Sequence, residues 1–124
     1  TGNNRTHMIR IPDKGRFELR LADGAVNPYL LQAAIVASGL LGIENKYILP
    51  DMSYEDNFNG HKINEKRLLP ENLGESLKML DEDSLFKEKI GIEFVNSYLK
   101  LKKKEWRDYL SYFSDWEVQN TLDI

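Results

Sequence analysis

Alternating apolar and polar residues mark the first part of the chain. "MIRIP" (8–12) and "RFELRL" (16–21) both follow the period of a half-buried β-strand. Between them, "DKG" ends in a glycine, which suits the positive φ of a three-residue hairpin loop. This loop length predicts an antiparallel hairpin in which Pro12 lies opposite Arg16, Ile11 opposite Phe17, Arg10 opposite Glu18, and Ile9 opposite Leu19.

The predicted register gives the hairpin two chemically different faces. The apolar face carries Ile9, Ile11, Phe17 and Leu19. The charged face carries Arg10, Arg16, Glu18 and Arg20. A slip of one residue would set Arg10 against Phe17 and mix the two faces, so the pattern specifies this register.

A long apolar helix is predicted after the hairpin. Asn27 and Pro28 form a typical helix start, with Asn as N-cap and Pro at the first helical position. The helix from 28 to about 46 is apolar almost all round, which is typical of a helix buried on several sides. Residues 47–70 form a polar connector with little periodicity.

The rest of the chain, 71–124, has the pattern of helices. We expect Pro70 to open a helix with Leu73, Leu77 and Leu80 on one stripe, and a short helix to begin at Ser84. A longer helix is predicted over 92–118, and it includes the basic segment "KLKKKEWR" (100–107), whose lysines are expected to form its solvated face. The aromatic and apolar positions at near-helical spacing are Phe94, Tyr98, Leu101, Tyr109, Phe113 and Trp116. The predicted fold class is α+β, an N-terminal antiparallel hairpin followed by a mainly helical region.

Composition narrows the class of protein. The 124 residues carry a net charge of −3, so no overall basic field points to nucleic acid, although the arginines gather near the N-terminus. Cysteine is absent, which excludes disulfides and thiolate metal sites and fits a cytoplasmic protein. The longest apolar run, 29–43, is too short and interrupted to cross a bilayer, so no membrane partner is expected.

The charged face of the hairpin has two interpretations. It can be a solvated surface with an internal ion pair. Alternatively, the arginine forks can bind phosphate or carboxylate oxygens, and Glu18 can supply a hard oxygen ligand to Mg²⁺ or Mn²⁺. His7 and His61 are each isolated, which favours a structural or solvated role for both.

Four motifs in residues 3–46 resemble the C-terminal part of the catalytic domain of glutamine synthetases. They are "NRTHMIRIP", the "RFELR" strand, the "DGAVNPY" turn and the long Ala-rich helix that ends in "GI". The remaining helices look like the tail of the group labelled type III. The resemblance implies that the chain, 1–124, is a C-terminal portion of such a domain, with active-site residues in 1–24, a buried helix in 25–46, a connector in 47–70 and C-terminal helices in 71–124.

The resemblance also implies roles for individual residues. Arg5, Arg10 and Arg16 match arginines that contact ATP phosphates, and Arg10 matches one that acts on the transferred phosphoryl group. Glu18 matches a ligand of a divalent metal, Mg²⁺ or Mn²⁺, and Arg20 matches the arginine that holds the carboxylate of glutamate. The implied reaction joins glutamate and ammonia through γ-glutamyl phosphate, in a cytoplasmic enzyme that forms a large ring-shaped homo-oligomer.

Other functions remain open at this stage. A γ-glutamylmethylamide synthetase or another γ-glutamyl-amine ligase belongs to the same superfamily, and a non-catalytic helical interaction module is an alternative of a different class. The start at Thr1 and the over-apolar helix favour a fragment. Since most of the implied active site lies upstream, we expect the isolated chain to be inactive.

Overall fold

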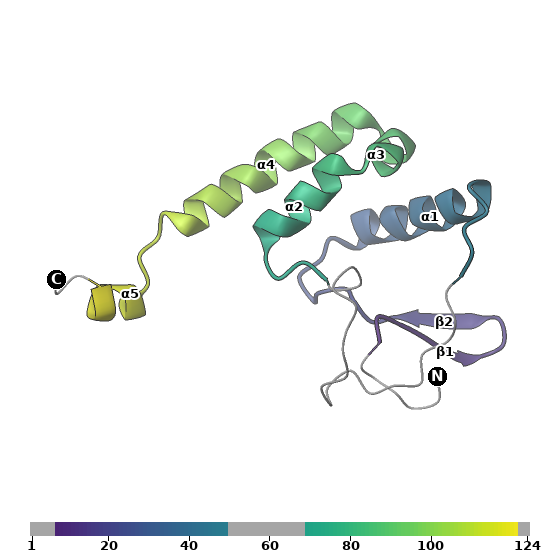
Figure 1. Ribbon diagram of the computed structural model, residues 1–124, viewed down its shortest axis with the longest axis horizontal. Helices are drawn as coiled ribbons and strands as arrows, with labels where there is room; N and C mark the ends of the chain where they lie inside the picture. The colour runs from purple at the N-terminus through teal and green to yellow at the C-terminus, as the bar shows by residue number, and fades with distance from the viewer. Residues whose placement is uncertain (1–6, 50–68, 122–124) are drawn as a thin grey trace. The chain divides into compact units, whose positions relative to one another are not determined.

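The chain forms a β-hairpin followed by helices (Figure 1). The computed structural model describes residues 7–49 and 69–121. The elements, in order, are β1 (Ile9–Asp13), β2 (Arg16–Leu19), α1 (Pro28–Glu44), α2 (Leu73–Glu82), α3 (Ser84–Ile90), α4 (Ile92–Leu110) and α5 (Asp115–Thr121). The predicted α+β class is confirmed. The chain divides into two compact units, 1–69 and 70–124, which we describe separately.

The hairpin in the first unit keeps most of the predicted register, but not at the loop. Ile9 pairs with Leu19 and Arg10 with Glu18, as expected. The predicted pairing of Pro12 with Arg16 is wrong, because Asp13 takes that position.

A β-bulge explains this difference. Ile11 and Pro12 together lie opposite Phe17, and the loop is shortened to Lys14 and Gly15. Proline has no N–H to donate to the ladder, so a bulge is one of the few places where a strand tolerates it. Gly15 has φ of 81°, the positive value expected from the sequence.

The ends of α1 follow from local side-chain chemistry. The Asn27 side-chain oxygen accepts hydrogen bonds from the backbone N–H groups of Tyr29 (3.0 Å) and Leu30 (3.3 Å), which confirms the predicted N-cap. The helix ends at Glu44, two residues earlier than predicted. Lys46 adopts a left-handed φ of 53° just beyond this end, a conformation that terminates helices.

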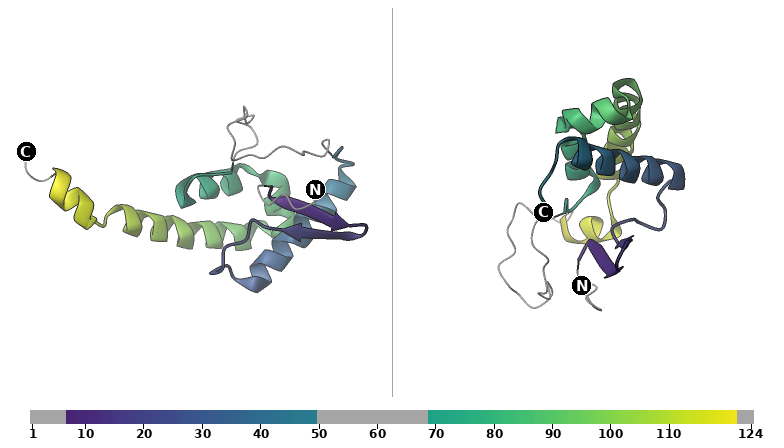
Figure 2. Two further views of the ribbon diagram at one scale, coloured as in Figure 1. Left: turned by 90° about the horizontal axis from the view of Figure 1, so that it is seen from below. Right: turned by 90° about the vertical axis from the view of Figure 1, so that its right-hand side faces the viewer.

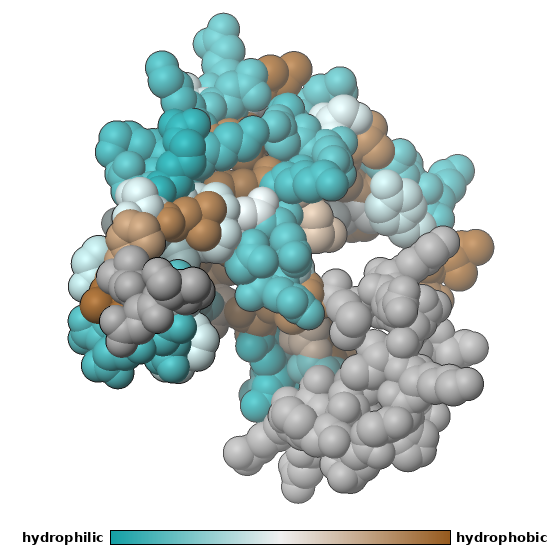
Figure 3. Space-filling model, turned by 60° about the vertical axis from the view of Figure 1, so that its left-hand side comes forward, coloured by the Kyte–Doolittle hydropathy of each residue, from teal (hydrophilic) through white to brown (hydrophobic). Residues whose placement is uncertain are grey.

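Apolar surface remains open in the first unit. The apolar face of the hairpin and one side of α1 line a cavity of about 820 Å³. Only Ala37 of α1 is buried, whereas Val36 and Ile43 are 61% and 75% exposed. On the face that Figure 3 draws, apolar side chains of the described residues, in brown, show between hydrophilic ones in teal. Burial of the helix over 25–46 therefore stays a prediction.

The described part of the second unit contains four helices, and side chains cap the starts of three of them, α2, α3 and α5. The helix predicted to open at Pro70 begins at Leu73, because Asn72 caps it by accepting a hydrogen bond from the Glu75 N–H at 2.9 Å. The Glu75 carboxylate in turn accepts from the Glu71 N–H at 2.9 Å. The start of α3 at Ser84 is confirmed, and the Asp83 carboxylate caps it.

A small core holds α2, α3 and α4 together. Its buried members are Leu77, Val95 and Leu99, and the partly buried side chains packed against them are Leu73, Leu80, Ile90 and Trp106. Figure 2 shows that α2 lies alongside α4. The leucine stripe of α2 thus packs as its spacing indicates. From α4, however, the inward residues are Val95, Leu99 and Trp106, whereas Phe94 and Leu101 of the aromatic stripe are 49% and 63% exposed.

The predicted single helix over 92–118 is wrong, because it divides into α4 and α5. Ser114 and Glu117 form a capping box: the Glu117 N–H donates to the Ser114 hydroxyl at 3.2 Å, and the Ser114 N–H donates to the Glu117 carboxylate at 2.8 Å. This pair starts a new helix at Asp115. In the described ranges, no helix has the length and apolar character needed to cross a membrane.

Candidate functional site

The charged face of the hairpin is organised around one carboxylate. Arg10 Nη1 lies 3.1 Å from Glu18 Oε2, across the ladder between β1 and β2. Arg16 Nη2 lies 3.2 Å from the other oxygen, Oε1, along the same strand. Each oxygen of Glu18 is therefore paired with a different arginine, and the predicted clustering of these three residues is confirmed.

The strand geometry explains why these side chains meet. Side chains at i and i+2 of a strand share a face, which brings Arg16 next to Glu18. Arg10 is the cross-strand partner of Glu18, and directly opposed residues interact across an antiparallel pair. Opposite charges at such positions stabilise the hairpin modestly, because both pairs are partly exposed.

Arg20 extends this face beyond the end of β2. Its backbone N–H donates to the Met8 carbonyl at 2.8 Å, so the ladder continues to this residue. An open depression of about 480 Å³ is lined by Arg10, Glu18, Leu19 and Arg20. An anionic group that entered it would meet two guanidinium groups and one carboxylate.

Two of the residues singled out from the sequence are not placed. Arg5 and His61 lie outside the described residues. His7 is described and is half-buried.

The bulge also brings an unexpected residue to the charged face: Asp13 stands opposite Arg16, where the sequence pattern predicted Pro12. A proline in the middle of an otherwise alternating strand was the signal for this bulge.

Glu18 is a chemically suitable donor for a divalent cation. Its carboxylate is 37% exposed and borders the depression. Mg²⁺ is commonly held by one or two carboxylates together with substrate phosphates, so a single carboxylate beside anion-binding arginines fits such an ion. Within residues 7–49 and 69–121, no group of three or more His, Asp or Glu side chains gathers to form a metal cage.

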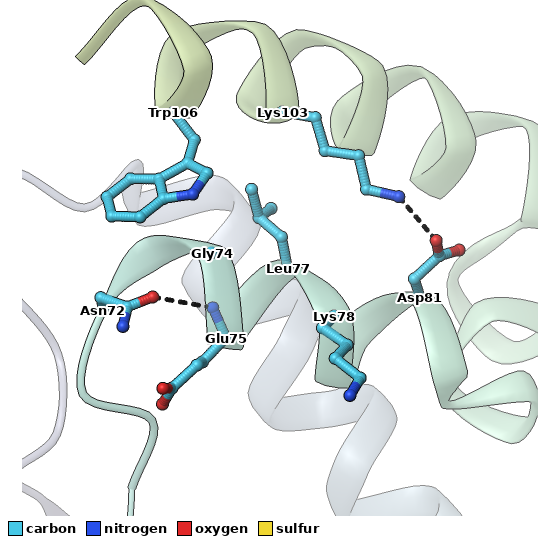
Figure 4. A pocket seen from close by; sticks show the side chains of 8 residues that line it. All are labelled: Asn72, Gly74, Glu75, Leu77, Lys78, Asp81, Lys103 and Trp106. Carbon is cyan, nitrogen blue, oxygen red and sulfur yellow. Dashed lines mark hydrogen bonds and ion pairs between the residues drawn. The ribbon is translucent and has the colours of Figure 1, made fainter. Parts of the chain in front are cut away.

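A second depression, of about 480 Å³, lies between α2 and α4 (Figure 4). Leu77 and Trp106 provide apolar lining, and Asp81 forms ion pairs with Lys103 (2.6 Å) and Lys87 (3.0 Å). The hydrogen bond from Lys103, followed by that from Lys87, lowers the pKa of Asp81. These charges join the helices of the second unit to one another, so we assign this depression to helix packing.

The fold and the charged face define an α+β chain with an arginine–glutamate cluster on its hairpin. Residues 1–121 match the family described as glutamine synthetase, catalytic domain. The chain belongs to this family.

Similar proteins agree with this assignment. The chain is 52% identical to a glutamine synthetase of Rhizobium meliloti, over 100% of the chain and 29% of that protein. It is 39% identical to a glutamate–methylamine ligase of Methyloversatilis universalis, over 99% of the chain and 28% of that protein. A solved structure described as apo GmaS without ligand matches with a TM-score of 0.90 and 44% identity, over 98% of the chain and 29% of that structure. The chain thus spans less than a third of the length of these relatives.

Proposed function

We propose that the charged face of the hairpin is one wall of the active site of an ATP-dependent glutamate–ammonia ligase, which forms glutamine through γ-glutamyl phosphate. The observation that carries this proposal is the Arg10–Glu18–Arg16 cluster in a chain of the glutamine synthetase family. A solvated surface does not need two arginines on one carboxylate beside an open depression. Guanidinium groups match phosphate oxygens in geometry and charge, so two arginines beside an open depression support binding of a polyphosphate.

The arginines would act on the anionic groups of the substrates. Arg5, Arg10 and Arg16 would bind the phosphates of ATP, and Arg10 would stabilise the charge of the phosphoryl group during its transfer. Catalysis of phosphoryl transfer depends mainly on such positioning and electrostatic stabilisation. Arg20, which lines the same depression, would hold the carboxylate of glutamate.

Glu18 would be one of the ligands of Mg²⁺ or Mn²⁺. Such an ion, when bound, neutralises charge on the phosphate oxygens. Glu18 contributes a hard oxygen at the edge of the depression, and its own position is fixed by Arg10 and Arg16. The other ligands would come from the remainder of the longer protein, so we expect the isolated chain to be inactive.

The remaining expectations follow from the family. The longer protein would work in the cytoplasm as a large ring-shaped homo-oligomer on small-molecule substrates. The exposed apolar surface of α1, which the described residues do not cover, is consistent with further contacts in the longer protein.

Methylamine is the second candidate for the amine substrate. It is favoured by the 39% identity to a glutamate–methylamine ligase, which extends over 99% of the chain. Ammonia is preferred because the identity to glutamine synthetases reaches 52%. Comparison of kcat/KM for the two amines with the full-length protein distinguishes them.

The test of the proposal is Glu18→Gln in the full-length protein. Loss of the charged oxygen should weaken Mn²⁺ binding by at least about tenfold, the cost seen even for groups that only support a metal ligand. Metal-dependent γ-glutamyl transfer should fall with it. Asp13→Asn is the matched control, since it removes one carboxylate from the same hairpin, and it should change Mn²⁺ affinity much less. Unchanged Mn²⁺ affinity in Glu18→Gln would refute the metal-ligand role.

A further inference from the structure

The cationic side chains in the basic segment 100–107 of α4 fall into two groups. Three of the five form ion pairs with carboxylates, and these pairs are Lys102–Glu105, Lys103–Asp81 and Lys104–Asp108. Lys100 and Arg107, the other two, form no ion pair with any residue that the structure describes. Both residues are exposed. They are therefore available to a ligand, whereas the other three cations already have partners.

The two unpaired cations line one depression. It has a volume of about 300 Å³, and we call it the α4 hollow; its lining consists of Asp81, Asn96, Leu99, Lys100, Lys103 and Arg107. The four polar residues that α4 contributes are three or four positions apart in the sequence, so they lie along one face of the helix. Leu99 is 3% exposed and belongs to the core, so the hollow lies directly against packed side chains.

The lining of the α4 hollow carries unbalanced charge. It holds three cations and one carboxylate, that of Asp81. Asp81 accepts hydrogen bonds from Lys103 at 2.6 Å and from Lys87 of α3 at 3.0 Å, so two ammonium groups already compensate its charge. The positive charges of Lys100 and Arg107 have no counter-charge among the described residues that line the hollow. An anion that entered it would therefore meet two cations without displacing an existing ion pair.

This arrangement suits a small anion with more than one negative charge. The guanidinium group of Arg107 presents a planar fork to oxygen acceptors, and the ammonium group of Lys100 acts as a point charge. The side-chain amide of Asn96 adds a neutral donor on the same face. Lys100 and Arg107 are about 10 Å apart along the helix axis, so two linked anionic groups reach both cations more readily than a single group does. The volume of about 300 Å³ suits a small molecule.

We propose that the α4 hollow binds a small polyanion of the phosphate class, held by Lys100 and Arg107 and oriented by Asn96. Lys103 keeps its contact with Asp81 and adds positive charge beside the ligand. Since the cations are exposed, binding weakens as the salt concentration rises. The residues of this site belong to the second unit, and the proposal does not rest on the function proposed for the hairpin.

Lysine footprinting of the full-length protein tests the site, with inorganic pyrophosphate as the probe. An acetylating reagent labels accessible lysines, and peptide mass spectrometry gives the labelling rate of each. Pyrophosphate at about twice its Kd should slow labelling of Lys100 about threefold, relative to sodium chloride of equal ionic strength, because the free fraction of the site falls as 1 + [L]/Kd rises. Lys104, paired with Asp108 on the same helix, is the internal control, and its rate should stay nearly constant.

Two variants separate the site from general charge effects. Arg107→Gln removes one of the two unpaired cations, so most of the protection of Lys100 should be lost. Lys104→Gln is the matched control, since it removes the same charge from the same helix at a position that does not line the hollow, and the protection should remain. Far-UV circular dichroism checks that both variants keep their helices.

The contrary outcomes are equally definite. Equal slowing at Lys100 and Lys104 would show general ionic screening and overturn the site. Unchanged labelling of Lys100 with pyrophosphate, or full protection in Arg107→Gln, would overturn it too. If Lys100 is not labelled even without pyrophosphate, the hollow is covered in the full-length protein and the proposal is wrong. Arg16→Gln in the hairpin should leave the protection intact, so failure of the proposed function is distinguishable from failure of this site.

Discussion

At Gly74, in the second unit, an added methyl group would meet the ring of Trp106. Gly74 is the second residue of α2, at the edge of the depression in Figure 4. A Cβ atom there would lie 2.6 Å from Nε1 and 2.9 Å from Cε2 of Trp106. It would also lie 3.2 Å from the side-chain oxygen of Asn72, the cap of the same helix. Gly74→Ala must therefore displace the indole ring or the cap.

The magnitude follows from two opposing terms. Overpacking of this kind costs about 1–3 kcal/mol. Replacement of glycine by alanine in a helix returns up to about 1 kcal/mol. Trp106 packs against the buried Leu77, Val95 and Leu99, so its ring moves only at the expense of these contacts. We expect a net loss of about 1–2 kcal/mol in the local stability of α2 and α4.

Native-state hydrogen exchange measures this loss directly, because it reports the free energy of local opening for each helix. Backbone amides of α2 and α4 should exchange about five- to thirty-fold faster in Gly74→Ala. The control is the same substitution in a Trp106→Leu background, where the close contact is absent and the loss should disappear. Unchanged or slower exchange in the single variant would refute the reasoning, as would an equal loss in both backgrounds.

Two further predictions concern charged groups of the second unit. The pKa of Asp81 is held below 3.8 by Lys103 and Lys87, so these ion pairs stabilise the folded state above that pH and are lost as the pH falls through the lowered pKa. Acid unfolding of this unit, followed by hydrogen exchange below about pH 4, should depend less on pH in Asp81→Asn, and an unchanged profile would exclude this role. Ser114→Ala removes the cap of α5, so amides of α5 should exchange up to about tenfold faster while those of α2 stay unchanged. If Ser114→Ala accelerated amide exchange equally in α2 and α5, the cap assignment would be contradicted.

Capping residues predict where the helices of this chain begin, whereas the hydrophobic period alone does not. The sequence predicts Asn27 as an N-cap, and α1 starts directly after it, at Pro28. Asn72 and the pair Ser114–Glu117 are signals of the same kind, and they set the starts of α2 and α5. Hydrophobic period alone merged α4 with α5, since the residues between the two helices keep the helical spacing.

The inward face of α4 was harder to predict from the sequence. Large aromatic side chains dominate its pattern, yet the buried positions are Val95 and Leu99. Which stripe of a helix packs inward depends on the partner helices, and here α2 and α3 contact the side of α4 that bears Val95, Leu99 and Trp106. A hydrophobic period identifies a helix, but two apolar stripes on one helix need tertiary contacts to decide between them.

The charged face was predicted correctly despite the wrong loop, and the strand period explains why. Arg16 and Glu18 share a face through the alternation of β2 alone, and Arg10 meets Glu18 before the bulge begins. The bulge alters only the positions between Arg10 and the loop, where it sets Asp13 opposite Arg16. Arg16 nevertheless forms its ion pair with Glu18, its neighbour on the same strand, and not with Asp13 across the ladder. The cluster is therefore centred on Glu18 by side-chain contacts from both strands, and a register change at the loop leaves that centre in place.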